Sequence, residues 1–151
     1  MNIYKSAGTG KSAKSVRIVA AGLLIVFTIM LCSCSFSVTT ANLQNIQTAS
    51  QIDSNNKPVT VTGVFGTTAP YIYLTGAINN APQGTKVRAD WIYTEAEPDI
   101  SIDSAVLTTV IANDSFSFNL SKPTNNWPVG KYEVKLYIDD KYSKSAYFEV
   151  K

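Results

Sequence analysis

The segment KYEVKLYI, residues 131–138, alternates apolar and polar side chains without interruption. Successive side chains of a β-strand point to opposite faces, so this alternation predicts a strand with one face in a core and the other in water. Asp139-Asp140-Lys141 follows as a tight turn, and Ala146, Phe148 and Val150 continue the apolar face beyond it. The two segments therefore predict a β-hairpin at the end of the chain.

Short runs of β-branched and aromatic residues, separated by turn signals, extend this pattern back to Pro58. Seven strands are predicted, near residues 59–65, 71–79, 85–94, 104–112, 114–120, 131–139 and 142–150. Trp91 falls in the middle of the third strand and is expected to point inward. One sheet could not cover both Trp91 and the aromatic face of the hairpin, so we expect an all-β fold of two sheets packed face to face.

Two motifs in these strands resemble a known family. Gly84-Thr85-x-Val87-x-x-x-Trp91 is followed by Trp127-Pro128-x-Gly130-x-Tyr132-x-Val134. The pattern is similar to the small immunoglobulin-like β-sandwich modules of bacterial surface proteins and lipoproteins. The resemblance implies that Trp91 is the core tryptophan and Tyr132 a tyrosine corner, its hydroxyl bonded to the backbone of the preceding loop. It implies no catalytic residues, because this sandwich serves many unrelated functions.

The beginning of the chain has the parts of an export signal. Residues 18–31 form an uncharged apolar run of 14 residues, preceded by the basic residues Lys5, Lys11, Lys14 and Arg17. This length suits the apolar part of a secretory signal and is short of the about 20 residues that span a bilayer. The basic residues indicate that the start stays in the cytoplasm and that the rest is exported.

The apolar run ends in Leu31-Cys32-Ser33-Cys34, which resembles the lipobox of bacterial lipoproteins. The resemblance implies a signal peptide over residues 1–33 and lipidation of Cys34 with palmitate-type acyl chains. The expected location is the cell membrane or outer membrane, facing away from the cytoplasm. The alternative is an uncleaved anchor helix over residues 18–38.

The remaining chain divides into two parts. Residues 34–57 are rich in Ser, Thr, Asn and Gln without a regular period, and are predicted to be a flexible tether. Residues 58–151 are predicted to be the single folded domain.

Composition excludes several classes of function. After Cys34 there are nine basic and 11 acidic residues, so the mature charge of −2 offers no surplus of cations for a nucleic-acid partner. Gly8-Thr9-Gly10-Lys11-Ser12 lacks the first glycine of a P-loop, and nucleotide binding is not expected. The chain has no histidine, and its two cysteines are accounted for by the signal and the lipid. Histidine-dependent catalysis, thiolate metal sites and a bound cofactor are therefore not expected.

Two groups of residues are candidates for a site. Glu95, Glu97, Asp99 and Asp103 lie between predicted strands, and the last three are weak calcium candidates. Their spacing lacks the order of a calcium loop, and solvated loop charge is the favoured interpretation. Tyr71, Tyr73, Tyr137 and Tyr147 are predicted to face outward, where aromatic rings could bind a protein or glycan. Outward tyrosines are also simply good strand formers. Trp127 is expected to pack in its loop beside Pro128.

We therefore expect a non-enzymatic, lipid-anchored immunoglobulin-like domain that binds a protein or glycan at the cell envelope. One alternative is a structural accessory subunit of an envelope complex. The other is a hydrolase that uses carboxylates alone, with the acidic loop as its site.

Overall fold

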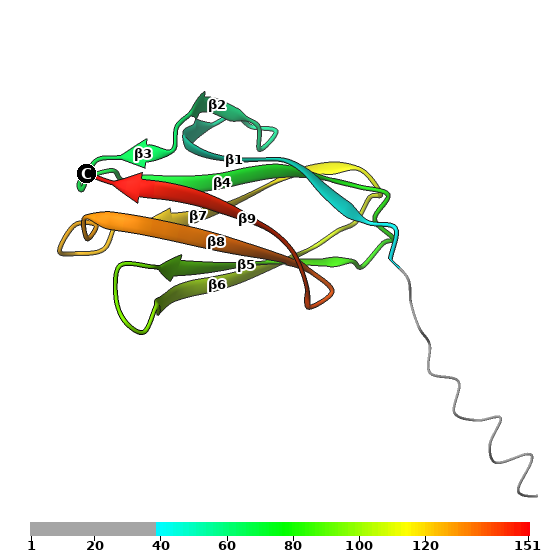
Figure 1. The fold of residues 1–151 in the computed structure, drawn as a ribbon. Helices are drawn as coiled ribbons and strands as arrows, with labels where there is room; N and C mark the ends of the chain where they lie inside the picture. Colours follow the sequence, from blue (N-terminus) through cyan, green and yellow to red (C-terminus); the bar gives the residue numbers. More distant parts are fainter. Residues whose placement is uncertain (1–38) are drawn as a thin grey trace, which may run out of the picture. The chain divides into compact units, whose positions relative to one another are not determined.

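The computed structural model describes residues 39–151, which form nine β-strands and no helix (Figure 1). In chain order they are β1 (Asn42–Ile52), β2 (Pro58–Val61), β3 (Val64–Phe65), β4 (Tyr71–Asn79), β5 (Lys86–Tyr93), β6 (Ile100–Thr108), β7 (Asp114–Ser121), β8 (Gly130–Ile138) and β9 (Lys141–Val150). This described part holds no helix with the length and hydropathy that crossing a bilayer requires.

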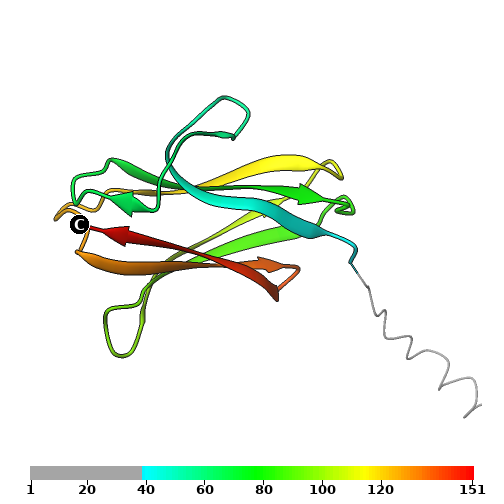
Figure 2. The same cartoon turned by 45° about the horizontal axis from the view of Figure 1, so that its top comes forward.

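The strands make two sheets packed as layers (Figure 2). Sheet A has the order β2-β1-β4-β7, and sheet B the order β3-β9-β8-β5-β6. In sheet A, β1, β4 and β7 take the places of the A, B and E strands of an immunoglobulin domain. In sheet B, β9, β8 and β5 take those of the G, F and C strands. The prediction of an all-β, immunoglobulin-like sandwich is confirmed.

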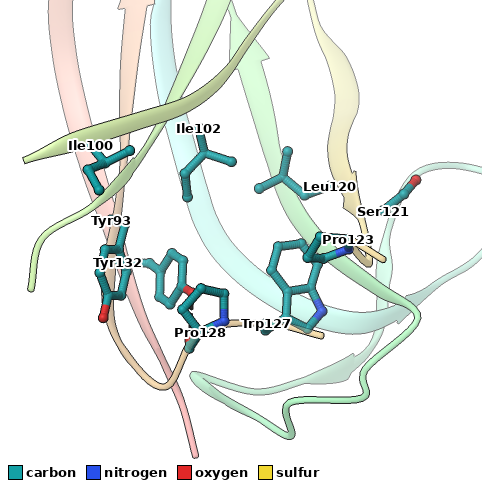
Figure 3. Close-up of a pocket in the computed structure, with 9 residues that line it drawn as sticks. All are labelled: Tyr93, Ile100, Ile102, Leu120, Ser121, Pro123, Trp127, Pro128 and Tyr132. Carbon is teal, nitrogen blue, oxygen red and sulfur yellow. Dashed lines mark hydrogen bonds between the residues drawn. The ribbon is translucent and has the colours of Figure 1, made fainter. Parts of the chain in front are cut away.

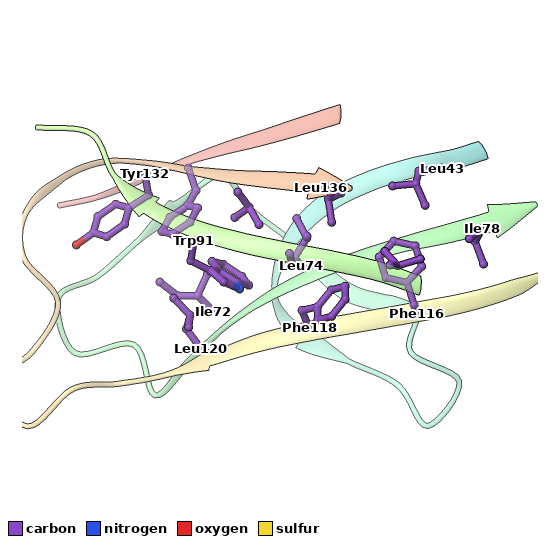
Figure 4. Packing of buried hydrophobic residues seen from close by; sticks show 14 of the residues in the cluster. Leu43, Ile72, Leu74, Ile78, Trp91, Phe116, Phe118, Leu120, Tyr132 and Leu136 are labelled. Atoms are coloured by element: carbon purple, nitrogen blue, oxygen red, sulfur yellow. The ribbon is translucent and has the colours of Figure 1, made fainter. Parts of the chain in front are cut away.

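The core lies between the sheets and consists of the inward residues of each strand (Figure 4). Trp91 and Tyr132 are 1% and 2% exposed, as their alternation predicted. The Tyr132 ring stacks on Phe148 with centroids 4.8 Å apart and planes within 11°. Aromatic contacts of this kind add about 0.5–1.5 kcal/mol beyond the burial of their area.

Two local predictions about the last strands are confirmed. The Tyr132 hydroxyl donates a hydrogen bond of 2.6 Å to the carbonyl oxygen of Pro128, which is the expected tyrosine corner. The turn between β8 and β9 places Asp139 and Asp140 at φ 47° and 64°. Aspartate tolerates this left-handed conformation better than most residues, and a turn with two positive φ angles matches the twist of a hairpin.

The prediction of a flexible tether over residues 34–57 is wrong from Asn42 onward. β1 occupies residues 42–52 and pairs with both β2 and β4, so it lies inside sheet A. Its Leu43 is 1% exposed and belongs to the core. The folded domain therefore begins at about Thr39 and not at Pro58.

The order of strands also corrects two predicted boundaries. The single strand expected near 59–65 is two short strands, β2 in sheet A and β3 in sheet B, so the chain changes sheets between them. The strand expected near 104–112 begins earlier, at Ile100, and ends at Thr108. Residues 109–113 connect it to β7.

Candidate functional site

An apolar pocket of about 340 Å³ opens at the end of the sandwich where β6 begins and β7 ends (Figure 3). Its walls come from β5, β6, β7, β8 and the connection between β7 and β8. The residues that line it are Tyr93, Ile100, Ile102, Leu120, Ser121, Pro123, Trp127, Pro128 and Tyr132. Apart from the Ser121 hydroxyl, the side chains are aliphatic or aromatic, as is usual for pockets that bind ligands.

The pocket lies between the edge strands of the two sheets, each of which has a neighbouring strand on one side only. β6 is the last strand of sheet B and β7 the last strand of sheet A, and no described strand bridges them. The register of β5 and β6 shifts between Trp91 and Ile92, so that Ile102 is an extra residue on β6. A bulge of this kind redirects a side chain. In Figure 3 Ile102 lies opposite Leu120 and Ile100 lies above Tyr93; the two isoleucines remain 40% and 53% exposed, respectively.

The polar atoms of the three aromatic rings are already bonded within the domain. The Trp127 indole N–H donates to the carbonyl oxygen of Ala69 at 2.7 Å, and the Tyr93 hydroxyl donates to that of Val129 at 3.0 Å. The Tyr132 hydroxyl is held by Pro128, and burial, with a smaller contribution from Tyr93, raises the pKa of Tyr132 to about 12. These rings therefore offer a ligand apolar surface and no free hydrogen-bond donor.

The acidic loop between β5 and β6 borders this end of the domain. Glu95 approaches Lys131 at 4.0 Å, and its Cγ lies where a side chain on Gly130 would stand. Glu97 and Asp99 are exposed to solvent. Asp103 accepts a hydrogen bond of 2.8 Å from the backbone N–H of Ser104.

The structure does not assemble a calcium site from the three weak candidates Glu97, Asp99 and Asp103. Within residues 39–151 no group of three or more His, Cys, Asp or Glu side chains is placed to hold a metal ion. The Asp103 carboxylate instead accepts a hydrogen bond from its own strand, β6, which is an edge strand of sheet B.

The four candidate tyrosines lie on opposite faces of the sandwich and do not form one surface. Tyr71 and Tyr73 lie on the outer face of sheet A, with ring centroids 5.8 Å apart. Tyr137 and Tyr147 lie on the outer face of sheet B.

The sheet B tyrosines take part in a network of side chains. The guanidinium of Arg88 lies 4.2 Å from the centroid of the Tyr137 ring and covers one of its faces. Glu133 Oε1 accepts hydrogen bonds from the Ser145 hydroxyl at 2.6 Å and the Tyr147 hydroxyl at 3.3 Å. Tyr147 is 69% exposed and keeps most of its ring available for contact.

Sequence reasoning missed the apolar pocket. It expected Trp127 to pack in its loop beside Pro128, with a ligand contact as the less favoured alternative, and gave no role to Ile100 or Ile102. The buried indole instead bonds to Ala69, in the loop before β4, and lines the pocket. Ile100 and Ile102 are β-branched residues that alternate with polar ones between Asp99 and Asp103. This pattern could have predicted that a strand with one apolar face begins here. The predicted lipidation site, Cys34, lies outside the described residues.

Comparison with known proteins gives likeness of fold alone. No protein-family model and no curated protein matches the chain. Among solved structures, it is similar to an alkylpurine DNA glycosylase from Pseudomonas fluorescens bound to DNA containing an abasic-site analogue, with 13% identity and a TM-score of 0.48. The match covers 89% of this chain but only 35% of the glycosylase.

The chain is also similar to an immunoglobulin-like protein from Pseudomonas aeruginosa, with 8% identity and a TM-score of 0.42, over 76% of this chain and 100% of that one. Neither likeness says anything about function. The assignment of residues 39–151 to the immunoglobulin-like β-sandwiches rests on the order of their own strands.

Proposed function

We propose that residues 39–151 are a non-catalytic binding module, held outside the cytoplasm by a lipid on Cys34, that binds a protein of the cell envelope through the apolar pocket. The observation that carries this proposal is the pocket itself. Its floor is formed by the buried side chains of Trp127, Tyr132 and Leu120, and the Ile100 and Ile102 side chains at its rim are 53% and 40% exposed. Leaving such surface in water is unfavourable unless a partner covers it.

The chemistry of the pocket favours a protein over a glycan. A sugar carries hydroxyl groups that need hydrogen-bond partners when they leave water. The Trp127 N–H and the Tyr93 and Tyr132 O–H groups are already donated to backbone carbonyls, so these rings have no donor left for a sugar. Only Ser121 adds a side-chain hydroxyl to the lining. Leucine, isoleucine or phenylalanine side chains of a partner protein need only the apolar walls.

The acidic residues near the rim favour a partner segment with positive charge. Glu95, Glu97 and Asp99 lie on the loop that leads into Ile100 at the pocket rim, and among the described residues only Lys131 has an ion pair with one of them. A segment with one or two apolar residues beside a lysine or arginine would complement this rim, and opposite charge would speed its association. Charge complementarity of this type contributes more to specificity than to affinity.

The non-catalytic part of the proposal has its own support. Without histidine, hydrolysis would depend on carboxylates at a fixed separation on either side of a bond. Glu97 and Asp99 lie on an exposed loop, and Asp103 is engaged with the backbone of β6. A structural accessory subunit would also need a docking surface, and the same pocket would serve it.

The test compares two aspartate substitutions on β6. Ile102 and Val106 are 40% and 56% exposed, but only Ile102 lines the pocket. The full-length protein is crosslinked in cells, purified, and the attached envelope protein quantified. We expect Ile102→Asp to abolish the attachment and Val106→Asp to leave it unchanged. Equal attachment in both variants would show that the partner binds elsewhere.

A further inference from the structure

The connection between β6 and β7 holds two large apolar side chains in solvent, at the end of the domain opposite the pocket. Val110 and Ile111 are 69% and 54% exposed. The backbone around them is fixed, because Thr109 exchanges hydrogen bonds of 2.9 Å with Thr85 and Gly84. On the other side of the two residues, the Ala112 carbonyl oxygen accepts a hydrogen bond of 2.9 Å from the Ala81 N–H, so the loop is anchored before and after Val110 and Ile111.

The chain enters the sandwich at this same end. The Thr40 hydroxyl donates to the carbonyl oxygen of Asn80 at 3.0 Å, and the Asn80 N–H donates to Asn113 Oδ1 at 3.0 Å. The start of β1 is thus connected, through the loop after β4, to the loop that carries Val110 and Ile111.

Because β1 is folded, few residues separate the domain from the expected lipid anchor at Cys34. Asn42, the first residue of β1, follows Cys34 by eight residues, which span at most about 28 Å when fully extended. If residues 34–57 were all tether, the reach would be about 80 Å. With β1 folded into sheet A, this end of the domain must stay close to whatever surface holds Cys34.

We propose that Val110 and Ile111 insert into the interfacial layer of the lipid bilayer that carries the chain. This rests on the proposed function, in that the lipid on Cys34 supplies the attachment. The contact is apolar, since Lys86 and Lys141 at this end are offset by Asp114, Asp139 and Asp140, which leaves no surplus of cations for anionic headgroups. Burying two such side chains at the boundary between headgroups and acyl chains is favourable and would hold the domain in one orientation.

The orientation has a consequence for the pocket. β6 runs nine residues from Ile100, at the pocket, to Thr108, next to the loop of Val110 and Ile111. A strand of this length spans about 30 Å. With the loop in the bilayer, the pocket opens away from the membrane, where an envelope protein can reach it.

The test uses the full-length lipidated protein in phosphatidylcholine vesicles. After removal of the signal and lipidation of Cys34, the mature chain has no free thiol, so an introduced cysteine is the only labelling site. Ile111→Cys and Val110→Cys receive a thiol-reactive fluorescent probe. Val129→Cys, at the pocket end, and Val59→Cys, on β2, are controls of similar exposure, 63% and 62%. Quenching is measured with a nitroxide-bearing phosphatidylcholine in the vesicles.

We expect the nitroxide lipid to quench most of the fluorescence at positions 110 and 111 and to leave positions 129 and 59 unchanged. Equal quenching at positions 111 and 129, whether strong or absent, would overturn the membrane contact. The parent protein without an introduced cysteine separates the two proposals. If it takes the label, Cys34 carries no lipid, and both the anchor and this inference fail. If it takes no label and position 111 is not quenched, only the inference fails.

Discussion

Replacing Tyr132 with phenylalanine tests the tyrosine corner. The substitution keeps the ring that stacks on Phe148 and removes only the hydroxyl that donates to Pro128 at 2.6 Å. Such a hydrogen bond contributes about 0.5–1.5 kcal/mol net, and a buried acceptor left without a donor costs about 1–3 kcal/mol. We expect Tyr132→Phe to lower the free energy of unfolding by about 1–3 kcal/mol at neutral pH.

Tyr71→Phe is the matched control, because it removes a hydroxyl from a tyrosine that is 44% exposed on the outer face of sheet A. Its expected cost is within about 0.5 kcal/mol. The assay is urea unfolding of the domain in both variants and the parent protein, followed by fluorescence. Equal free energies of unfolding for the two variants would refute the corner.

The same substitution makes a prediction about pH. Burial raises the pKa of Tyr132 from 10.0 to about 12 in the folded protein, so the folded state favours the neutral hydroxyl. The associated stability is complete below pH 10 and is lost as the pH rises toward 12, with about 1.4 kcal/mol lost by pH 11. Tyr132→Phe cannot lose this contribution. The difference in stability between parent and variant should therefore shrink by about that amount between pH 8 and pH 11, and a constant difference would contradict the raised pKa.

Three further outcomes are expected. Leu43→Ala, in the segment predicted to be a tether, should lower the free energy of unfolding in urea by about 2–5 kcal/mol, because β1 is part of the core. An unchanged free energy of unfolding would show that this segment is a tether. Cys34→Ala should abolish incorporation of a fatty-acid probe, and Cys32→Ala should not. The reverse pattern would show that Cys32 is the lipidated cysteine. Asp99→Asn combined with Asp103→Asn should leave the melting temperature the same with and without calcium, and a calcium-dependent rise in the parent alone would identify a metal site.

The parts of the fold that follow from local pattern were predictable. Tyr132 and its inward neighbours alternate without interruption, and Trp91 falls in phase with apolar residues on either side. In such strands burial of one face determines the register, so the alternation alone predicts which side chains face the core.

β1 was not predictable by the same reasoning. Its sequence is mostly polar, and a bulge at Asn45, with φ 52°, changes which residues face the core. Leu43 and Ile46 both pack against the core although they are three positions apart, which breaks the period of two. The strand forms because β2 and β4 supply partners for its backbone on both sides, and that support comes from the tertiary structure.

The pocket depends on tertiary structure even more. Ile102 reaches it through a bulge, and Leu120 reaches it from the other sheet. The sequence around each residue indicates a strand but does not show that the two side chains meet. Only the arrangement of β6 and β7 as edge strands on the same side of the sandwich brings them together.

Photocrosslinking in living cells tests most directly whether the pocket binds an envelope protein. A photoreactive amino acid replaces Ile102 at the pocket rim or, as a control, Val59, which is 62% exposed on β2. Binding in the pocket predicts a specific adduct with one envelope protein from position 102, competed by a peptide of that protein, and none from position 59. An adduct from position 59 alone, or none from either position, would contradict it.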